Sequence, residues 1–206
     1  MHTVIILDHP YGATAGTNEP HHRSLVVAMA DAARKGLDAA GHTHETIDLE
    51  ELQFDPVLSA DDLRSWRTGS EPRPDVAEMQ RAVARAEHIV LAFPTWRMAP
   101  PARTKGFLDR VLTKGFAFEE PKLGGALHRT LHRLRGVSIL TAMTTPAPLY
   151  GTLFGAPSHR ILARGTFQLI GIRRVWFTAI GRSAQRSPAS RQRALDRIQR
   201  RFASSK

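Results

Sequence analysis

The chain of 206 residues contains no cysteine, and this absence removes several kinds of chemistry at once. Without thiols the protein has no disulfide, no cysteine nucleophile and no cysteine-ligated metal. It also lacks any apolar run near the ~20 residues that a transmembrane helix needs. The amino-terminal run Thr3–Leu7 is too short for the apolar core of a signal peptide. We therefore expect a cytoplasmic protein with no membrane span.

Several short signatures of catalysis are also missing. The sequence has no G-x-G-x-x-G dinucleotide motif, no P-loop pattern and no G-x-S-x-G nucleophile elbow. His42 with His44 on a strand, and His128 with His132 on a helix, would each point two rings to one face. Neither pair has a third ligand near it in the sequence, so we expect no metal site.

Acidic residues are comparatively few, with 19 against 29 basic ones and a net charge of +10. Such a balance raises the question of nucleic acid or an anionic surface. However, the basic residues are spread widely, with local densities only at 128–135 and 191–201. In the second of these, Leu195, Ile198 and Phe202 form one helical stripe, which leaves the arginines on a solvated side. We therefore expect no nucleic-acid site, although acidic substrates or a phosphorylated cofactor would be attracted.

Apolar runs alternate with amphipathic segments throughout, which predicts a single α/β domain over residues 1–206. The expected strands are Thr3–Leu7, His42–Ile47, a run from His88, Val137–Ala142 and Val175–Ile180. The expected helices are Ser24–Ala40, Asp61–Thr68, Asp75–Ala86, a segment after Pro101, Ser158–Ile170 and a last one opened by Ser187 and Pro188. A capping box of Asp75 with Glu78 is predicted at the third helix.

This alternation indicates a doubly wound parallel sheet of five strands between two helical layers. We predict the flavodoxin-like order 2-1-3-4-5, because the loops after strands one and three then lie side by side at the switch point. A stiff loop, Pro94–Pro100, lies at the carboxyl end of the third strand and just ahead of a helix. In open α/β sheets ligands bind at such a place, where backbone N–H groups are free.

The stretch from Phe93 to Phe118 resembles the core motif of the flavodoxin-like NAD(P)H:quinone oxidoreductase family. Fifteen matching positions over 26 residues carry the resemblance: Phe93, Pro94, Trp96, Pro101, Ala102, Lys105, Gly106, Phe107, Asp109, Arg110, Val111, Gly115, Phe116, Ala117 and Phe118. A second segment, Asp48-Leu49 followed by Phe54–Leu58, resembles the same family and is expected to pin a loop to the sheet rim. The resemblance implies a flavin (FAD or FMN), NAD(P)H as electron donor and a quinone-like acceptor. It also implies a homodimer, with Gly115–Phe118 and residues 119–134 at the interface.

In that family the loop after the first strand holds the flavin phosphate or pyrophosphate. Here the matching or nearby groups are His9, Thr14, Thr17, Ser24 and Leu25. The loop is longer than in the family, and Val26 stands where the family has asparagine. His9 as a packed strand-end residue, and Ser24 as a helix cap, are equally good interpretations.

The flavin ring would lie along Pro94, Thr95, Trp96 and Arg97, with Trp96 supplying a large flat surface. Where this chain has Arg97 the family often has a second aromatic residue. The guanidinium is either a surface substitution, a group that stabilises the anionic reduced flavin, or a ligand for an acidic substrate.

After the fourth strand the family shows T-T-G-G-x-x-x-x-Y, and this chain keeps Thr144, Thr145 and Tyr150 but neither glycine. The resemblance assigns charge stabilisation or proton relay to Tyr150 and to a following histidine, here His159. A half-buried tyrosine and a histidine at a helix start are the plain alternatives.

These residues predict a flavin-dependent oxidoreductase that transfers hydride from NAD(P)H to a quinone or similar acceptor by a ping-pong cycle. The alternative is a non-catalytic or regulatory relative that binds a ligand or partner after its reductase site decayed. The long first loop and the missing glycines favour this alternative, and the intact 93–118 motif opposes it. A nucleic-acid or anionic-surface binder driven by charge is a third and weaker interpretation.

Overall fold

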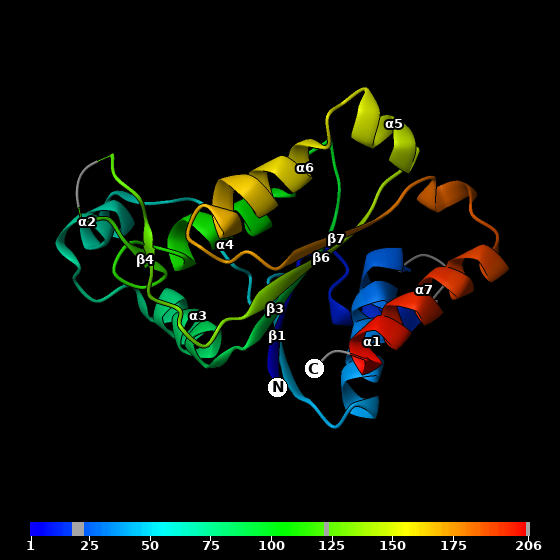
Figure 1. Cartoon of the computed structure of the whole chain (residues 1–206), viewed down its shortest axis with the longest axis horizontal. Helices are drawn as coiled ribbons and strands as arrows, with labels where there is room; N and C mark the ends of the chain where they lie inside the picture. Colours follow the sequence, from blue (N-terminus) through cyan, green and yellow to red (C-terminus); the bar gives the residue numbers. More distant parts are fainter. Residues whose placement is uncertain (18–22, 122–123, 205–206) are drawn as a thin grey trace.

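The computed structural model describes residues 1–17, 23–121 and 124–204. Its centre is a parallel sheet in the order β2-β1-β3-β6-β7 (Figure 1). A separate antiparallel pair is formed by β4 (Phe118–Glu119) and β5 (His128–Arg129), in the region of residues 119–134. Without that pair, the order is the predicted 2-1-3-4-5. The five strands are β1 (His2–Leu7), β2 (Thr43–Asp48), β3 (His88–Pro94), β6 (Gly136–Ala142) and β7 (Val175–Ile180).

Helices cover both faces of the sheet, which confirms the three-layer α/β prediction. Figure 1 shows α1 and α7 on one side and α3, α4 and α6 on the other. The α-helices are α1 (Leu25–Ala39), α2 (Ala60–Thr68), α3 (Pro74–Arg85), α4 (Ala102–Val111), α5 (Ala147–Thr152), α6 (Pro157–His159) and α7 (Pro188–Ala203). Two 3-10 segments, η1 (Ala13–Thr17) and η3 (Ser183–Gln185), and a π-helix, η2 (Arg160–Gln168), complete the described elements.

Two apolar cores lie on the two faces of the sheet because side chains alternate along each strand. Ile5 and Leu7 of β1 belong to the core beneath α1 and α7, while Val4 and Ile6 belong to the core beneath α3, α4 and η2. The central strand β3 is buried along its whole length. This explains its continuous apolar sequence, since a strand covered on both faces needs no polar alternation.

The parallel register brings the carboxyl ends of the strands to one edge of the sheet. Leu7 pairs with Ala92, Pro94 pairs with Ala142, and Ala142 pairs with Ile180. The loops that follow β1, β3, β6 and β7 therefore leave the sheet side by side. This edge is where the predicted site residues after β1, β3 and β6 converge.

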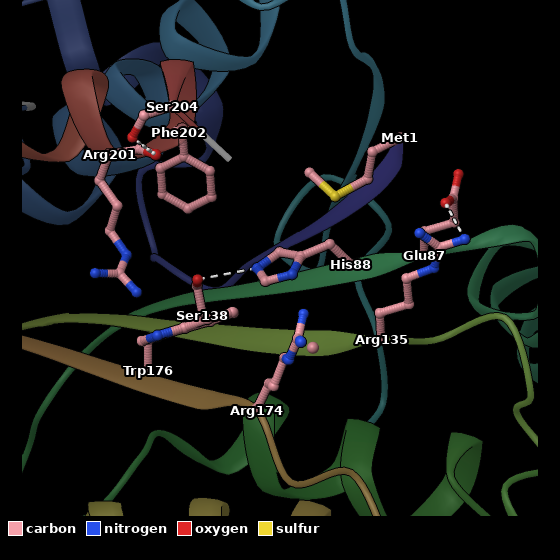
Figure 2. Close-up of a pocket in the computed structure, with 11 residues that line it drawn as sticks. Met1, Glu87, His88, Arg135, Ser138, Arg174, Trp176, Arg201, Phe202 and Ser204 are labelled. Carbon is pink, nitrogen blue, oxygen red and sulfur yellow. Dashed lines mark hydrogen bonds and ion pairs between the residues drawn. The ribbon is translucent and has the colours of Figure 1, made fainter. Parts of the chain in front are cut away.

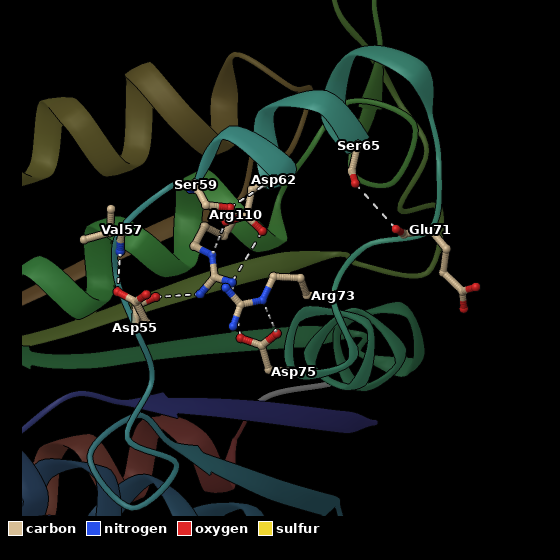
Figure 3. A network of polar contacts seen from close by, with 9 residues as sticks. All are labelled: Asp55, Val57, Ser59, Asp62, Ser65, Glu71, Arg73, Asp75 and Arg110. Carbon is tan, nitrogen blue, oxygen red and sulfur yellow. Dashed lines mark hydrogen bonds and ion pairs between the residues drawn. The ribbon is translucent and has the colours of Figure 1, made fainter.

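Arg110 of α4 joins the two family motifs and is fully buried at 0% side-chain exposure. Its guanidinium donates to the Asp62 carboxylate at 3.1 Å, the Asp55 carbonyl at 2.6 Å and the Asp75 carboxylate at 3.2 Å (Figure 3). Burial raises the pKa of Asp62, but hydrogen bonds from Ser59 and Arg110 outweigh it and hold that pKa below its ordinary value. The network ties α2, the segment before it and α3 to α4, the helix that follows the Pro94–Pro100 loop.

Gly106 makes the close approach between the same motifs possible. A Cβ at this position would lie 2.4 Å from the Cα of Pro56 and 2.5 Å from its carbonyl oxygen. Any side chain here would push the Phe54–Leu58 segment away from α4. The segment is held in place, but by α4 and not by the sheet rim as expected.

The predicted capping box of Asp75 with Glu78 is wrong. The N-cap of α3 is Arg73, which makes no side-chain capping bond, and Asp75 instead accepts from Arg110. The capping box is at α2, where Ser59 and Asp62 bond to each other's backbone N–H groups. The helix begins one residue before Asp75, with Pro74 in its first turn, so Asp75 lies inside α3 and cannot be its N-cap.

Candidate functional site

A groove of about 470 Å³ lies at the carboxyl edge of the sheet. It is built by the ends of β1, β3, β6 and β7 and by the start of α1. The lining residues are His9, Arg23, Ser24, Leu25, Val26, Pro94, Thr95, Trp96, Arg97, Ala142, Met143, Thr144 and Ser183. Its size falls within the range of small-molecule and cofactor sites. Eight of the predicted site residues are in this lining: His9, Ser24, Leu25, Pro94, Thr95, Trp96, Arg97 and Thr144.

Asp8, the residue that follows β1, anchors the first turn of α4, directly after the loop between β3 and α4. Its buried carboxylate accepts from the backbone N–H of Thr104 at 2.7 Å and from the Thr104 hydroxyl at 2.6 Å. Burial raises the pKa of Asp8, and these two bonds oppose the rise. An acceptor at the first turn of α4 satisfies one of its free N–H groups and fixes where the helix begins.

The loop is also tied sideways to β6. The backbone N–H of Thr95 donates to the carbonyl of Ala142 at 2.9 Å, and the hydroxyls of Thr95 and Thr141 lie 2.7 Å apart. Thr95 thereby continues the β3–β6 ladder past Pro94. This places the next residue, Trp96, at the mouth of the groove.

Trp96 and Ala99 close a two-residue hairpin, each accepting the other's backbone N–H at 3.0 and 2.9 Å. The two central residues, Arg97 and Met98, have φ of +47° and +65°. Positive φ at both positions is typical of a type I′ turn, which usually contains Asn and Gly. Arg97 and Met98 both have long side chains, so their positive φ is strained and must be stabilised by neighbouring contacts. Such strain is common at functional sites.

Ser158 supplies one of the contacts that hold this turn. Its hydroxyl donates to the carbonyl of Met98 at 2.9 Å, and its own backbone N–H donates to the hydroxyl oxygen of Tyr150 at 2.8 Å. Ser158 is fully buried. The chain Tyr150–Ser158–Met98 therefore supports the turn that presents Trp96 and Arg97.

Trp96 is 50% exposed, a large fraction for so large an apolar side chain at a groove. Arg97 beside it is also exposed. A flat ring and a guanidinium on one turn, at the mouth of a groove, suit a planar ligand that carries negative charge.

The opposite side of the groove is the amino terminus of α1. Ser24 is its N-cap, accepting from the N–H of Val27 at 3.3 Å, so the helix-cap interpretation of Ser24 is confirmed. Leu25 and Val26 follow at the first turn, where N–H groups and the helix dipole favour an anion. Arg23 adds a positive charge at the same place. Burial lowers the pKa of His9, and the nearby carboxylates of Asp8, Asp48 and Glu50 oppose that fall.

Several predicted residues lie elsewhere. Thr14 lies exposed in η1 and Thr145 lies beside Thr144, both outside this lining, and the side chain of Thr17 lies outside what the structure describes. Tyr150 is 2% exposed, with its ring stacked on Phe177 at 6.4 Å. The structure thus places Tyr150 behind the turn rather than in the groove.

His159 lies next to this support and also outside the groove lining. Its ring meets the edge of Phe177 at 5.2 Å, and the side chain is half-buried. Burial lowers the pKa of His159, with the nearby Arg164 charge acting in the same direction. The neutral form is therefore favoured.

Met143 and Ser183 line the groove but were missed from the sequence. The N–H of Ser183 donates to the carbonyl of Met143 at 3.0 Å, which brings the loops after β6 and β7 together. Gly181 makes this possible, because a Cβ there would lie 2.4 Å from the Ala147 nitrogen. The glycine that follows the fifth apolar run is the signal that could have indicated a close approach.

Metal chemistry finds no support within the described ranges. No group of three His, Cys, Asp or Glu side chains among those residues is arranged to hold a metal ion. None of the described helices is long and apolar enough to span a bilayer.

The groove offers an anion-binding helix start, a stacking surface and backbone N–H groups.

Comparisons with known proteins agree with this geometry. A family model described as a flavodoxin-like fold matches residues 1–202. An NAD(P)H oxidoreductase of Haemophilus influenzae is 40% identical over 72 residues, covering 35% of this chain and 35% of that protein. The aligned region thus spans about a third of that relative's length.

Two solved structures share the fold across the whole chain. An NAD(P)H:quinone oxidoreductase from Methanothermobacter marburgensis superposes with a TM-score of 0.82 at 24% identity, covering 99% of this chain and 98% of that one. An FMN-dependent NADH-azoreductase from Bacillus anthracis, solved in complex with FMN, gives a TM-score of 0.73 at 17% identity, with 98% of each chain covered. At these identities the likeness establishes the architecture.

Proposed function

The chain belongs to the flavodoxin-like family whose model matches residues 1–202, and from this premise we propose that it is a flavin-dependent NAD(P)H oxidoreductase. The reaction would be a ping-pong hydride transfer from NAD(P)H to a quinone or a similar small acceptor. The observation that carries the proposal is the pairing of Trp96, half-exposed on its strained turn, with the start of α1 across one groove. The two structurally similar proteins, a quinone reductase and an FMN-dependent azoreductase, support the same class.

The residues of the groove fit a flavin. Its phosphate would bind at the first turn of α1, between Leu25, Val26 and the Arg23 charge. Its ring would lie against Trp96, with the backbone of Pro94 and Thr95 along the polar edge. When bound, the flavin supplies the two-electron chemistry that no side chain of this protein offers.

The protein's own contribution is placement and electrostatics. The Trp96–Ala99 hairpin is held by its two backbone bonds and by Ser158, so the protein itself would set the position of Trp96. Backbone N–H groups and the guanidinium of Arg97 would stabilise negative charge on a reduced ring or orient an acidic acceptor. In a ping-pong cycle, donor and acceptor would use the same face of the ring in turn.

The absorption spectrum of the purified protein tests the proposal directly. A bound flavin gives bands at about 375 and 450 nm, and addition of NADH or NADPH should bleach the longer one. A protein that remains colourless after incubation with FMN and with FAD, followed by desalting, would refute it.

We also propose that the protein works as a homodimer. Large apolar side chains are exposed on α2 and the segment before it, and on the stretch from α5 to η2 (Val57, Leu58, Leu63, Leu149, Leu153, Phe154 and Ile161). Figure 1 shows α2 and the helix formed by α6 and η2 with α4 on the side of the sheet away from α1 and α7, while α5 lies beyond the end of the sheet. A second copy of the chain covering this side would remove those groups from water. Light scattering at micromolar concentration that finds only monomer, with flavin still bound, would rule out the dimer.

One observation favours the non-catalytic alternative. Tyr150, to which the family resemblance gives a catalytic role, is buried and already bonded to Ser158. A relative with a decayed site would bind flavin or another ligand without turnover. Bound flavin that NADH and NADPH both fail to reduce would favour this alternative over the enzyme.

A further inference from the structure

A second groove, of about 360 Å³, lies at the opposite edge of the sheet. It is formed where β3, β6 and β7 begin and where α7 ends. Since the seven residues of β3 separate the two edges, the grooves are about 20 Å apart. The lining residues are Met1, Glu87, His88, Arg135, Gly136, Ser138, Arg174, Trp176, Arg201, Phe202 and Ser204. The function proposed above uses none of them.

The floor of this groove is aromatic. His88 is 7% exposed, and its Nε2 lies 2.9 Å from the Ser138 hydroxyl. Its ring lies 5.6 Å from that of Trp176 and 6.2 Å from that of Phe202. Burial, with the Arg201 charge acting in the same direction, lowers the pKa of His88 to about 4, so this ring is neutral near pH 7.

Gly136 keeps the floor open. A Cβ at this position would lie 2.9 Å from the Trp176 ring and 3.3 Å from Nδ1 of His88. A side chain there would therefore fill the space between the two rings.

The rim is positively charged. Arg135 is partly neutralised by Glu87, whose carboxylate lies 3.7 Å away, while Arg201 lies over the Trp176 ring at 4.8 Å. Figure 2 shows Arg174 directed toward His88 from below, and Arg201 on the side of Trp176. Among the described residues neither Arg174 nor Arg201 forms an ion pair with a carboxylate. Three arginines thus face one glutamate around a neutral floor.

We propose that this groove binds a small organic anion with a planar ring, whose carboxylate or phosphate group lies between Arg174 and Arg201. Guanidinium groups bind both oxyanions through paired, charge-assisted hydrogen bonds. The ring of the ligand would cover His88 and Phe202, and its charge would offset the repulsion between the arginines. The volume is near the lower end of small-molecule sites, which suits a ligand no larger than a mononucleotide.

Isothermal titration of the full chain tests this proposal with four probes. Adenosine monophosphate and benzoate each carry a ring and an oxyanion, while inorganic phosphate and adenosine each carry one of the two. We expect adenosine monophosphate or benzoate to bind at least tenfold more tightly than inorganic phosphate or adenosine. Tighter binding of the nucleotide would identify an organic phosphate as the ligand class, and tighter binding of benzoate an aromatic carboxylate. Equal binding of the ring-bearing anions and inorganic phosphate would overturn the proposal.

Matched variants locate the binding. Arg174→Gln and Arg201→Gln should each weaken the preferred probe at least tenfold. Arg173→Gln and Arg200→Gln remove the adjacent exposed charges outside the groove and should leave binding unchanged. All four side chains are exposed, so the fold should be retained, as circular dichroism would verify. Equal losses in all four variants would indicate general charge attraction, as for a nucleic acid, and a loss caused by Arg97→Gln instead would place the probe in the other groove; either result overturns the proposal.

Discussion

His88 provides a prediction that the structure makes quantitative. It is the buried histidine at the start of β3, and the charged groups that line its groove are Arg174, Arg201, Arg135, Glu87 and the amino terminus at Met1. Its pKa is about 4 in the folded protein, against 6.5 for an ordinary histidine. The unfolded chain therefore binds a proton between these two pH values and the folded protein does not. By linkage, stability is full above pH 6.5 and is lost as the pH falls toward 4.

The size of the loss follows from the two pKa values. One pKa unit corresponds to about 1.4 kcal/mol, so lowering the pH from 8 to 5 should remove about 2 kcal/mol of unfolding free energy through this group. Most carboxylates stay ionised at pH 5, which keeps their contribution small. The loss is a large share of the stability of a typical domain.

Urea denaturation of the protein and of His88→Gln at pH 8 and pH 5 measures this pH-dependent loss of unfolding free energy. Glutamine keeps a side-chain donor near Ser138 but does not titrate. The variant should lose about 2 kcal/mol less than the parent between the two pH values. His128→Gln, at an exposed position, should behave as the parent does. Parallel losses in the parent and His88→Gln would refute the argument that burial keeps this histidine neutral.

Three further predictions concern the groove at the carboxyl edge and the contacts behind the 96–99 turn. Trp96→Ala should weaken flavin binding by ~1–3 kcal/mol through lost ring contact, as a flavin-release titration would show, and unchanged affinity would remove Trp96 from the site. Arg97→Met should lower the flavin midpoint potential by ~30 mV for each 1.4 kcal/mol of lost charge stabilisation, or raise the Michaelis constant of one substrate at unchanged potential. No shift in either quantity would show Arg97 to be a solvated residue. Tyr150→Phe should cost ~1–3 kcal/mol of unfolding free energy, because the buried N–H of Ser158 loses its acceptor. A lower kcat at unchanged stability would instead restore the catalytic interpretation.

The sequence by itself determined the elements and the order in which they pack. The apolar run from His88 to Phe93 indicates a strand covered on both faces, because a strand buried on both sides shows no polar alternation. Alternation with helical stripes then selects a parallel sheet. Ser24 and Ser187 are N-caps, as expected, because a cap depends on residues within one turn of it. The groove at the carboxyl edge follows from the same topology, and so do most of its lining residues.

Tertiary structure alone decided what depends on residues far apart in the chain. The carboxylate of Asp75 accepts from Arg110, 35 residues away in the chain, and Asp75 lies inside α3 rather than at its N-cap. Tyr150 looks like a catalytic residue in the sequence, yet its hydroxyl is bonded within the packed layer behind the 96–99 turn.

The groove at the amino edge has no sequence signal, because its arginines lie just before β6, just before β7 and in α7, and meet only when the sheet forms. The positive φ of Arg97 and Met98 could not be predicted from the sequence either, since nothing in those residue types favours it. Local preferences specify segments, whereas contacts between segments set the conformation of a strained turn and the charge of a cavity.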